Sequence, residues 1–340
     1  MSSKFSLSYC LRSRDYINKE AHDFYEYVFD RYERMIRIRE KLRALLELSR
    51  PPFHSVGVLP FILGGIMSWR LEGVFRWDIF AWGTLGVVLI MLATYYAGEY
   101  WDFEEDTLSA RNSPSKFAGG SQVLQRGILP RHIALRASLI SAILAIGIGL
   151  ILQFGYNTGP WTIPFGILGI LGGFFYSTRP LRWVSRGWGE LWIAFCYGWL
   201  PVAVSYYLQI GKIVQLIHWV SVPIGFTIFN VILLNEFPDY TADLTAGKTN
   251  LVVRLGRKRT SYIYGLTSLG SWSAMLLSLY QGVPIKTLWF YLPILILSIT
   301  LVALMMRGYW KDRIVLEKLC AANLLVNLGT TAVYILAFVS

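Results

Sequence analysis

Nine apolar runs, most of them about 20 residues long, recur along this chain of 340 residues. A run of this length can cross a bilayer as an α-helix. Only 16% of the residues are charged and 54% are hydrophobic, whereas a soluble domain carries about 25% charged residues. The sequence therefore predicts an all-α, polytopic membrane protein. The predicted spans are 53–69, 78–98, 133–154, 161–176, 188–208, 216–235, 262–281, 287–306 and 318–339.

Positive charge is unevenly distributed between the loops. The net charge is +11, and 15 Lys and Arg lie in loops 99–132, 177–187, 236–261 and 307–317, against 4 in the alternate loops. Cytoplasmic loops of membrane proteins carry such an excess, and residues 1–52 add 11 more Lys and Arg. This pattern predicts a cytoplasmic N-terminus and, after nine spans, a C-terminus outside. The charge therefore indicates topology and an anionic lipid bilayer as partner, and not a nucleic acid.

Residues 1–49 form a segment of their own ahead of the predicted transmembrane domain, 50–340. Apolar residues recur near helical spacing over about 20–49, which predicts an amphipathic helix at a cytoplasmic or interfacial position. The compact apolar region of a cleavable signal peptide is not evident there. The three cysteines of the chain are too few and too scattered to predict a zinc site or a disulfide framework.

Two acidic segments, each at the end of an apolar run, match each other. GEYWDFEED (98–106) and NEFPDYTAD (235–243) align without gaps at an offset of 137 residues. Both follow the pattern E-[YF]-x-D-[FY]-x-x-D at the predicted cytoplasmic ends of spans two and six. A spacing of four spans predicts two related four-helix halves plus one helix, with a site at the interface of the halves.

Each acidic segment places three carboxylates on one helix face, because positions i, i+3 and i+7 fall within about 60° of one another. Carboxylates this close raise one another's pKa unless cations neutralise them. Two Mg²⁺ ions would do so, since Mg²⁺ favours carboxylate oxygens and bridges to phosphates. Pro238 also predicts a kink or a helix end beside Asn235. The carboxylates are Glu99, Asp102 and Asp106 in the first segment and Glu236, Asp239 and Asp243 in the second.

These motifs resemble those of the UbiA superfamily of intramembrane prenyltransferases. The second motif of that family, N-x-x-x-D-x-x-x-D, is matched by Asn235, Asp239 and Asp243, and TAGKTNLVVRLG (245–256) resembles its continuation. The first motif of the family, N-D-x-x-D-x-x-x-D, keeps its two later aspartates in GEYWDFEED but has Gly and Glu at its start. The resemblance extends from residue 50 to the C-terminus.

Two further stretches resemble the 1,4-dihydroxy-2-naphthoate prenyltransferase branch, FAGGSQVLQRGIL (117–129) and GWGELWIAFCYGWLPVAVSYYLQIG (187–211). The resemblance implies Mg²⁺-dependent transfer of a prenyl group from a polyprenyl diphosphate to an aromatic acceptor, as in menaquinone biosynthesis. It also implies the inner membrane of a prokaryotic cell, with the active site facing the cytoplasm. Other acceptors stay open: 4-hydroxybenzoate, homogentisate or a glycerol-phosphate lipid.

The resemblance also implies roles for individual residues. The expected Mg²⁺ ligands are Asp102, Asp106, Asp239 and Asp243, with Glu99 and Asn235 as additional or water-mediated ligands. The expected diphosphate ligands are Lys116, Arg126, Lys248 and Arg254, with Arg111 and Arg179 as further candidates. Arg126 and Arg254 could equally be lipid-facing anchors. Tyr176 is a candidate to stabilise an allylic carbocation, and Glu190 either orients the acceptor, accepts its proton or forms a structural salt bridge.

Three other functions suit carboxylates in an apolar chain. A CDP-alcohol phosphotransferase requires one contiguous D-G-x-x-A-R…G-x-x-x-D-x-x-x-D signature, which this sequence lacks. A cation or proton transporter places its acids near the midplane of the membrane, whereas these acids lie at predicted cytoplasmic ends beside Lys and Arg. A scaffold protein that keeps the fold without catalysis stays open because the first motif is altered.

Overall fold

The computed structural model describes residues 4–112, 115 and 117–340. Every regular element in these residues is helical, with no strand among them, so the predicted all-α class is confirmed. The contacts between residues divide the chain into two units, Met1–Glu47 and Leu48–Ser340. Most of the first unit lies in one long helix, α1 (Lys4–Leu48).

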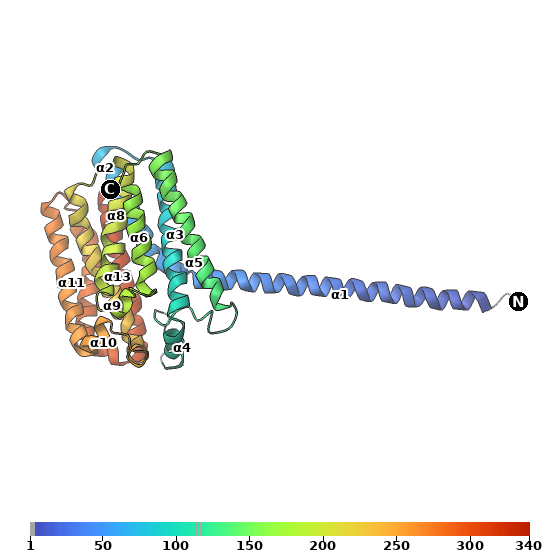
Figure 1. Cartoon of the computed structure of the whole chain (residues 1–340). Helices are drawn as coiled ribbons and strands as arrows, with labels where there is room; N and C mark the ends of the chain where they lie inside the picture. Colours follow the sequence, from blue (N-terminus) through green and yellow to red (C-terminus); the bar gives the residue numbers. More distant parts are fainter. Residues whose placement is uncertain (1–3, 113–114, 116) are drawn as a thin grey trace. The chain divides into compact units, whose positions relative to one another are not determined.

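The second unit is a bundle of helices that run side by side (Figure 1). Its longer helices are α2 (Ser55–Glu72), α3 (Trp77–Trp101), α5 (Arg131–Leu150), α6 (Thr162–Ser177), α8 (Leu200–Ile210), α9 (Gln215–Thr245), α11 (Arg257–Tyr280), α12 (Thr287–Met306) and α13 (Arg313–Val339). The shorter α-helices are α4 (Phe103–Asn112), α7 (Gly189–Ala194) and α10 (Leu251–Leu255). Short 3₁₀-helices are η1 (Pro51–His54), η3 (Trp183–Ser185) and η5 (Tyr309–Lys311), and the π-helical turns are η2 (Ile151–Gly155) and η4 (Phe195–Trp199).

Seven helical segments of the described chain are long and apolar enough to cross a membrane. A shorter apolar helix, α6, accompanies them. Helix α11 has 24 residues but is not among the seven, since Ser, Thr and Gly make up much of its length. The chain is therefore a membrane protein with several spans.

The bundle consists of two groups of helices. In the first group α3 packs against α2, α5 and α6, and in the second α9 packs against α7 and α11, with α12 beside α11. The groups meet where α2 packs against α8, and α13 contacts α2, α9 and α12. Large buried side chains fill these contacts, including Leu63, Met67, Tyr206, Ile224, Ile228, Phe237, Tyr264 and Tyr334.

The two acidic segments differ in local structure. Helix α3 ends at Trp101, Asp102 caps it, and α4 begins at the next residue. Helix α9, in contrast, does not end at Pro238 but continues to Thr245. Pro238 lacks the N–H that would bond to the carbonyl of Leu234, and the thiol of Cys320 donates to that carbonyl instead, at 3.7 Å. Such replacement partners from neighbouring helices let a proline stay inside a membrane helix.

Candidate functional site

Both acidic segments line one cavity of about 210 Å³ between the two groups of helices. The short helix α4, which begins inside the first segment, and the short helix α10, which follows the second, lie at the same end of the bundle (Figure 1). Six carboxyl groups and two cationic side chains of the described residues line the cavity, together with Asn235. The carboxyl groups belong to Glu99, Asp102, Asp106, Glu236, Asp239 and Asp243, and the cations are Arg50 and Lys248.

The carboxylates of α9 face the first group of helices. Asp239 accepts hydrogen bonds from the backbone N–H of Gly119, at 2.9 Å, and from the hydroxyl of Ser109. Asp243 accepts from the amide Nδ2 of Asn250 at 2.8 Å, and its Oδ1 lies 3.2 Å from Nζ of Lys248. The loop after α9 therefore folds back and brings its lysine and asparagine into the cavity.

The carboxylates of the first segment have hydroxyl and guanidinium partners. Glu99 accepts from both the backbone N–H and the hydroxyl of Ser121, at 2.7 and 2.8 Å. Nε of Arg50 lies 3.4 Å from Oε1 of Glu99. Asp102 accepts from the hydroxyl of Ser177 at 2.5 Å. Glu99 thus anchors a loop and a cation, which is a positioning role beside the expected one as metal ligand.

The loop between α4 and α5 ties both acid clusters together through two glycines. Gly119 and Gly120 have φ angles of +73° and +70°, a conformation that glycine adopts without the strain of a side chain. A Cβ atom on Gly120 would lie only 2.3 Å from Oδ2 of Asp106. The structure thus brings the backbone of Gly119 against Asp239 and the backbone of Gly120 against Asp106.

Lys248 is the cation that both acid clusters surround. Only 8% of its surface is exposed. Burial by itself lowers the pKa of Lys248, but the charges of Asp102, Asp243 and Asp106 outweigh burial and raise it. Burial raises the pKa of Asp106 well above its ordinary value, and the neighbouring Asp102 and Glu99 add to this effect. The six carboxyl groups of the cavity outnumber its two cationic side chains, and this crowding contributes to the raised pKa of Asp106.

This set of donors fits Mg²⁺ shared with a bound phosphate group. The available ligands are oxygens, as Mg²⁺ prefers, and proteins commonly hold Mg²⁺ by one or two carboxylates plus substrate phosphates. Within the residues that the structure describes, no three His, Cys, Asp or Glu side chains form a ready-made metal cage. The excess of buried carboxylate around one cavity therefore suits ions that a diphosphate completes.

Only some of the residues predicted to bind the phosphate, the carbocation or the acceptor reach the cavity. Lys248 and Tyr176 line it. Glu190 is buried beside it and accepts a hydrogen bond from the backbone N–H of Leu251 at 2.7 Å, which fixes the start of α10. Lys116 lies outside the described residues. Four predicted arginines are exposed at the surface away from the cavity lining, namely Arg111, Arg126, Arg179 and Arg254.

Two arginines at the acid clusters were not predicted from the sequence. Arg50 precedes α2, and Arg182 lies in the connection between α6 and α7. Nη2 of Arg182 lies 3.2 Å from Asp102 and also pairs with Glu105. Arg182 is three residues beyond the predicted Arg179 in the same loop, so the prediction indicated the right segment but not the residue that turns inward.

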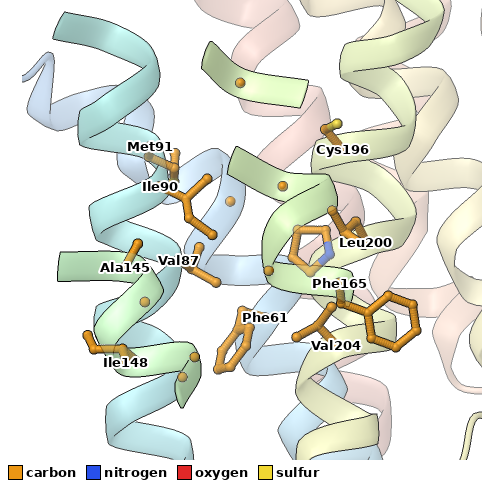
Figure 2. Close-up of a pocket in the computed structure, with 18 of the residues that line it drawn as sticks. Phe61, Val87, Ile90, Met91, Ala145, Ile148, Phe165, Cys196, Leu200 and Val204 are labelled. Carbon is orange, nitrogen blue, oxygen red and sulfur yellow. The ribbon is translucent and has the colours of Figure 1, made fainter. Parts of the chain in front are cut away.

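A second cavity, about 100 Å³ and almost entirely apolar, adjoins the first (Figure 2). Thr94 of α3 and Tyr197 of η4 line both cavities. The π-helical turn η4 lies between α7 and α8, and such turns are often found at functional sites. An apolar space that extends along the first group of helices therefore adjoins the charged cavity.

Comparison with known proteins gives consistent matches. Residues 58–326 match the model of the UbiA prenyltransferase family. The chain is 25% identical to a 1,4-dihydroxy-2-naphthoate octaprenyltransferase of Bacillus subtilis over 252 residues, which cover 71% of this chain and 78% of that protein. It is also 25% identical to a 2-carboxy-1,4-naphthoquinone phytyltransferase of Synechocystis over 227 residues, which cover 65% and 69%.

Solved structures share the fold. A digeranylgeranylglyceryl phosphate synthase is similar with a TM-score of 0.63 at 17% identity, covering 88% of this chain and 99% of that one. A structure from Archaeoglobus fulgidus bound to DMAPP and Mg²⁺ has a TM-score of 0.58 at 14% identity, covering 85% and 98%. At these identities the likeness establishes the arrangement of helices.

Proposed function

This chain belongs to the UbiA prenyltransferase family, and we propose that it transfers a polyprenyl group from its diphosphate to an aromatic acceptor in the membrane. The observation that carries this proposal is the cavity in which carboxylates of both acidic segments surround Lys248, with an apolar cavity directly beside it. A prenyl diphosphate has the same two parts, a charged head and an apolar tail.

The proposed cofactor is Mg²⁺, as in the related structure bound to DMAPP and Mg²⁺. Asp102 and Asp106 would hold it from one side and Asp239 and Asp243 from the other, with Glu99 and Asn235 as outer or water-mediated ligands. When bound, Mg²⁺ neutralises the charge that develops on a diphosphate leaving group.

The side chains of the cavity would bind the donor and protect the reaction. Lys248 donates hydrogen bonds to the diphosphate, and Arg182 holds Asp102 in place from the neighbouring loop. When the allylic C–O bond breaks, its electron pair stays with the diphosphate and a carbocation forms. Tyr95, Tyr176 and Tyr197 line the cavity, where their rings can stabilise a cation and exclude water.

We further propose a naphthoate as acceptor and nine spans. The description of one relative names a naphthoate and that of the other names a naphthoquinone. An aromatic acceptor of this kind suits a cavity inside a bundle of membrane helices.

The nine spans are the seven long apolar segments together with α6 and α11. The catalytic domain is residues 50–340, and residues 1–49 form a cytoplasmic or interfacial segment. The site would face the cytoplasm of a prokaryotic cell at its inner membrane.

The direct test is prenyl transfer by the purified full chain in phospholipid vesicles. Radiolabelled prenyl diphosphates are combined with 1,4-dihydroxy-2-naphthoate, 4-hydroxybenzoate, homogentisate or a glycerol-phosphate lipid, with and without Mg²⁺. We expect Mg²⁺-dependent product with the naphthoate, and its loss in Asp239→Asn but not in Asp78→Asn, which changes an exposed aspartate of α3. Full activity of Asp239→Asn, or uptake of an ion without any transfer, would count against the proposal.

A further inference from the structure

The apolar cavity beside the acid clusters has a defined length. On α3 its lining residues extend from Thr94 to Gly83, a rise of roughly 16 Å at about 1.5 Å per residue. On α6 the lining extends from Gly173 to Thr162, which gives the same rise. Two neighbouring helices of the first group, α3 and α6, thus give the same depth for the space.

Two residues mark the end of this cavity that adjoins the charged site. Thr94 and Tyr197 belong to both cavities. Helices α3 and α6 come so close there that a Cβ on Gly173 would lie 1.9 Å from Oγ1 of Thr94. Figure 2 shows Met91 and Cys196, each near one of these two residues in the chain, at one end of the cavity.

The opposite end is closed by packed apolar side chains. Figure 2 shows Phe61 and Val204 there, across from Ile148. Phe61, Ile148, Leu152 and Leu208 belong to one buried cluster, which Val204 joins. The ring of Phe61 lies against Gly83, since a Cβ there would be 2.6 Å from the ring. An apolar chain that extended through the cavity from the charged site would therefore be stopped by these side chains.

Glycines keep the far half of the cavity open. Gly149 of α5 and Gly166 of α6 both line it, and a Cβ on either would meet no heavy atom within 4 Å. A larger side chain at these positions can extend into the space without displacing the backbone. Such a side chain would shorten the cavity and leave the end beside the charged site unchanged.

We propose that this cavity limits the donor tail, and that Gly149 and Gly166 set the limit. An extended isoprene unit is roughly 5 Å long, being four carbon–carbon bonds of about 1.5 Å, so no more than about three units lie inside a space about 16 Å deep. Further units of a longer donor must leave between the helices and gain nothing from the cavity. The inference rests on the proposed function, because it assigns the occupant of the cavity from the donor in the adjoining site.

The test measures binding of non-reactive thiolodiphosphate analogues, so it does not depend on the acceptor. The purified full chain with Mg²⁺ is titrated with dimethylallyl, geranyl, farnesyl, geranylgeranyl and octaprenyl analogues. For the unaltered protein, affinity rises with each unit as far as farnesyl and then stays level. Gly149→Leu and Gly166→Leu bind the farnesyl analogue at least about tenfold more weakly, the size of effect that one extra or missing methylene has in an apolar pocket, and keep the affinity for dimethylallyl.

Gly147→Leu is the matched control. Gly147 is on the same helix as Gly149, a Cβ there also meets nothing within 4 Å, and it does not line the cavity. We expect Gly147→Leu to bind every analogue as the unaltered protein does. Equal effects of the substitutions at 147 and 149, or a continued rise in affinity to octaprenyl, would overturn the length limit while leaving the proposed function intact. Failure of the unaltered protein to bind any analogue would overturn the proposed function, and the inference with it.

Should a leucine variant not fold, the milder Gly149→Ala and Gly166→Ala give the same comparison with smaller shifts. In those variants the farnesyl affinity falls relative to that for dimethylallyl if the positions set the limit. An unchanged ratio in both alanine variants would contradict the proposal.

Discussion

Among individual residues, Lys248 is the cation on which both acid clusters act. Its ammonium group lies 3.2 Å from Asp243 and interacts with the charges of Asp102 and Asp106. Removal of this charge would leave buried carboxylates uncompensated and take a donor from the diphosphate. We expect Lys248→Met to lower kcat/KM by about 10²–10³-fold, as loss of one group that stabilises developing charge does.

The comparison for this change is Lys258→Met, which removes an exposed lysine of α11. Initial rates of prenyl transfer at saturating Mg²⁺ measure both variants. Similar rates in the two variants would show that Lys248 serves only to position the loop after α9.

Gly120 permits the loop between α4 and α5 to pass against Asp106. An alanine would need a left-handed conformation, at a cost of about 1–3 kcal/mol, and its Cβ would also contact the carboxylate. Gly127→Ala carries the same conformational strain, since its φ is +71°, but its Cβ would meet nothing within 4 Å.

We therefore expect both alanine variants to lower the unfolding temperature, and only Gly120→Ala to reduce the rate of transfer, by at least about tenfold. Thermal unfolding in detergent and initial rates separate the two effects. Equal loss of activity in Gly120→Ala and Gly127→Ala would show that strain in the loop, and not contact with Asp106, is responsible.

Among the elements, the connection between α6 and α7 brings Arg182 to the first acid cluster. A hydrogen bond to a charged group contributes about 1.5–3 kcal/mol, so Arg182→Gln should weaken binding of the donor at least about tenfold. Arg179→Gln changes an exposed arginine of the same loop and should leave binding unaltered. Titration with a thiolodiphosphate analogue in the presence of Mg²⁺ measures the affinity of both variants. Weaker binding by Arg179→Gln than by Arg182→Gln would favour Arg179, the residue expected from the sequence.

Helices α9, α11 and α13 are joined by polar groups inside the bundle. Asn323 donates to the backbone carbonyl of Asn230 at 2.8 Å and accepts from the hydroxyl of Tyr264 at 2.9 Å. Hydrogen bonds between membrane helices contribute about 0.6 kcal/mol on average and up to about 1.7 kcal/mol, so Asn323→Leu should destabilise the protein by about 1–3 kcal/mol when both bonds are lost.

Unfolding in mixed detergent and denaturant measures this loss of stability. Thr300→Val is the control, because the hydroxyl of Thr300 is exposed and bonds only within its own helix, to the carbonyl of Ile296. A stability of Asn323→Leu equal to that of Thr300→Val would mean that apolar packing alone joins these helices.

The sequence predicts the bounds of several apolar helices well because hydropathy depends on local residues. The predicted span 287–306 has the bounds of α12, and 161–176 differs from α6 by one residue at each end. The repeat likewise located both acidic segments. The partners of those acids could not be predicted, since Arg50, Ser177 and Arg182 are brought to them by packing between distant helices. The arginines chosen for nearness in sequence, such as Arg126 and Arg254, turn to the surface instead.

For the whole molecule, the distribution of Lys and Arg predicts which end of the bundle faces the cytoplasm. The cavity and the short helices α4 and α10 lie at one end, and the C-terminus lies at the other (Figure 1). With nine spans, the N-terminus and the site should be cytoplasmic and Ser340 should be outside. An even number of spans would place both termini on the same side.

Single cysteines introduced into a chain without its three native cysteines test this topology. In intact cells an impermeant maleimide should label Ser340→Cys and Gly282→Cys, whereas Ser185→Cys and Lys311→Cys should react only after the membrane is opened. Gly282 and Lys311 are exposed positions in loops at the two ends of neighbouring helices, so they serve as mutual controls. Labelling of Lys311→Cys but not Gly282→Cys in intact cells would show that the topology is the reverse of the one predicted. Protection of both Ser340→Cys and Lys311→Cys would mean that α13 does not cross the membrane.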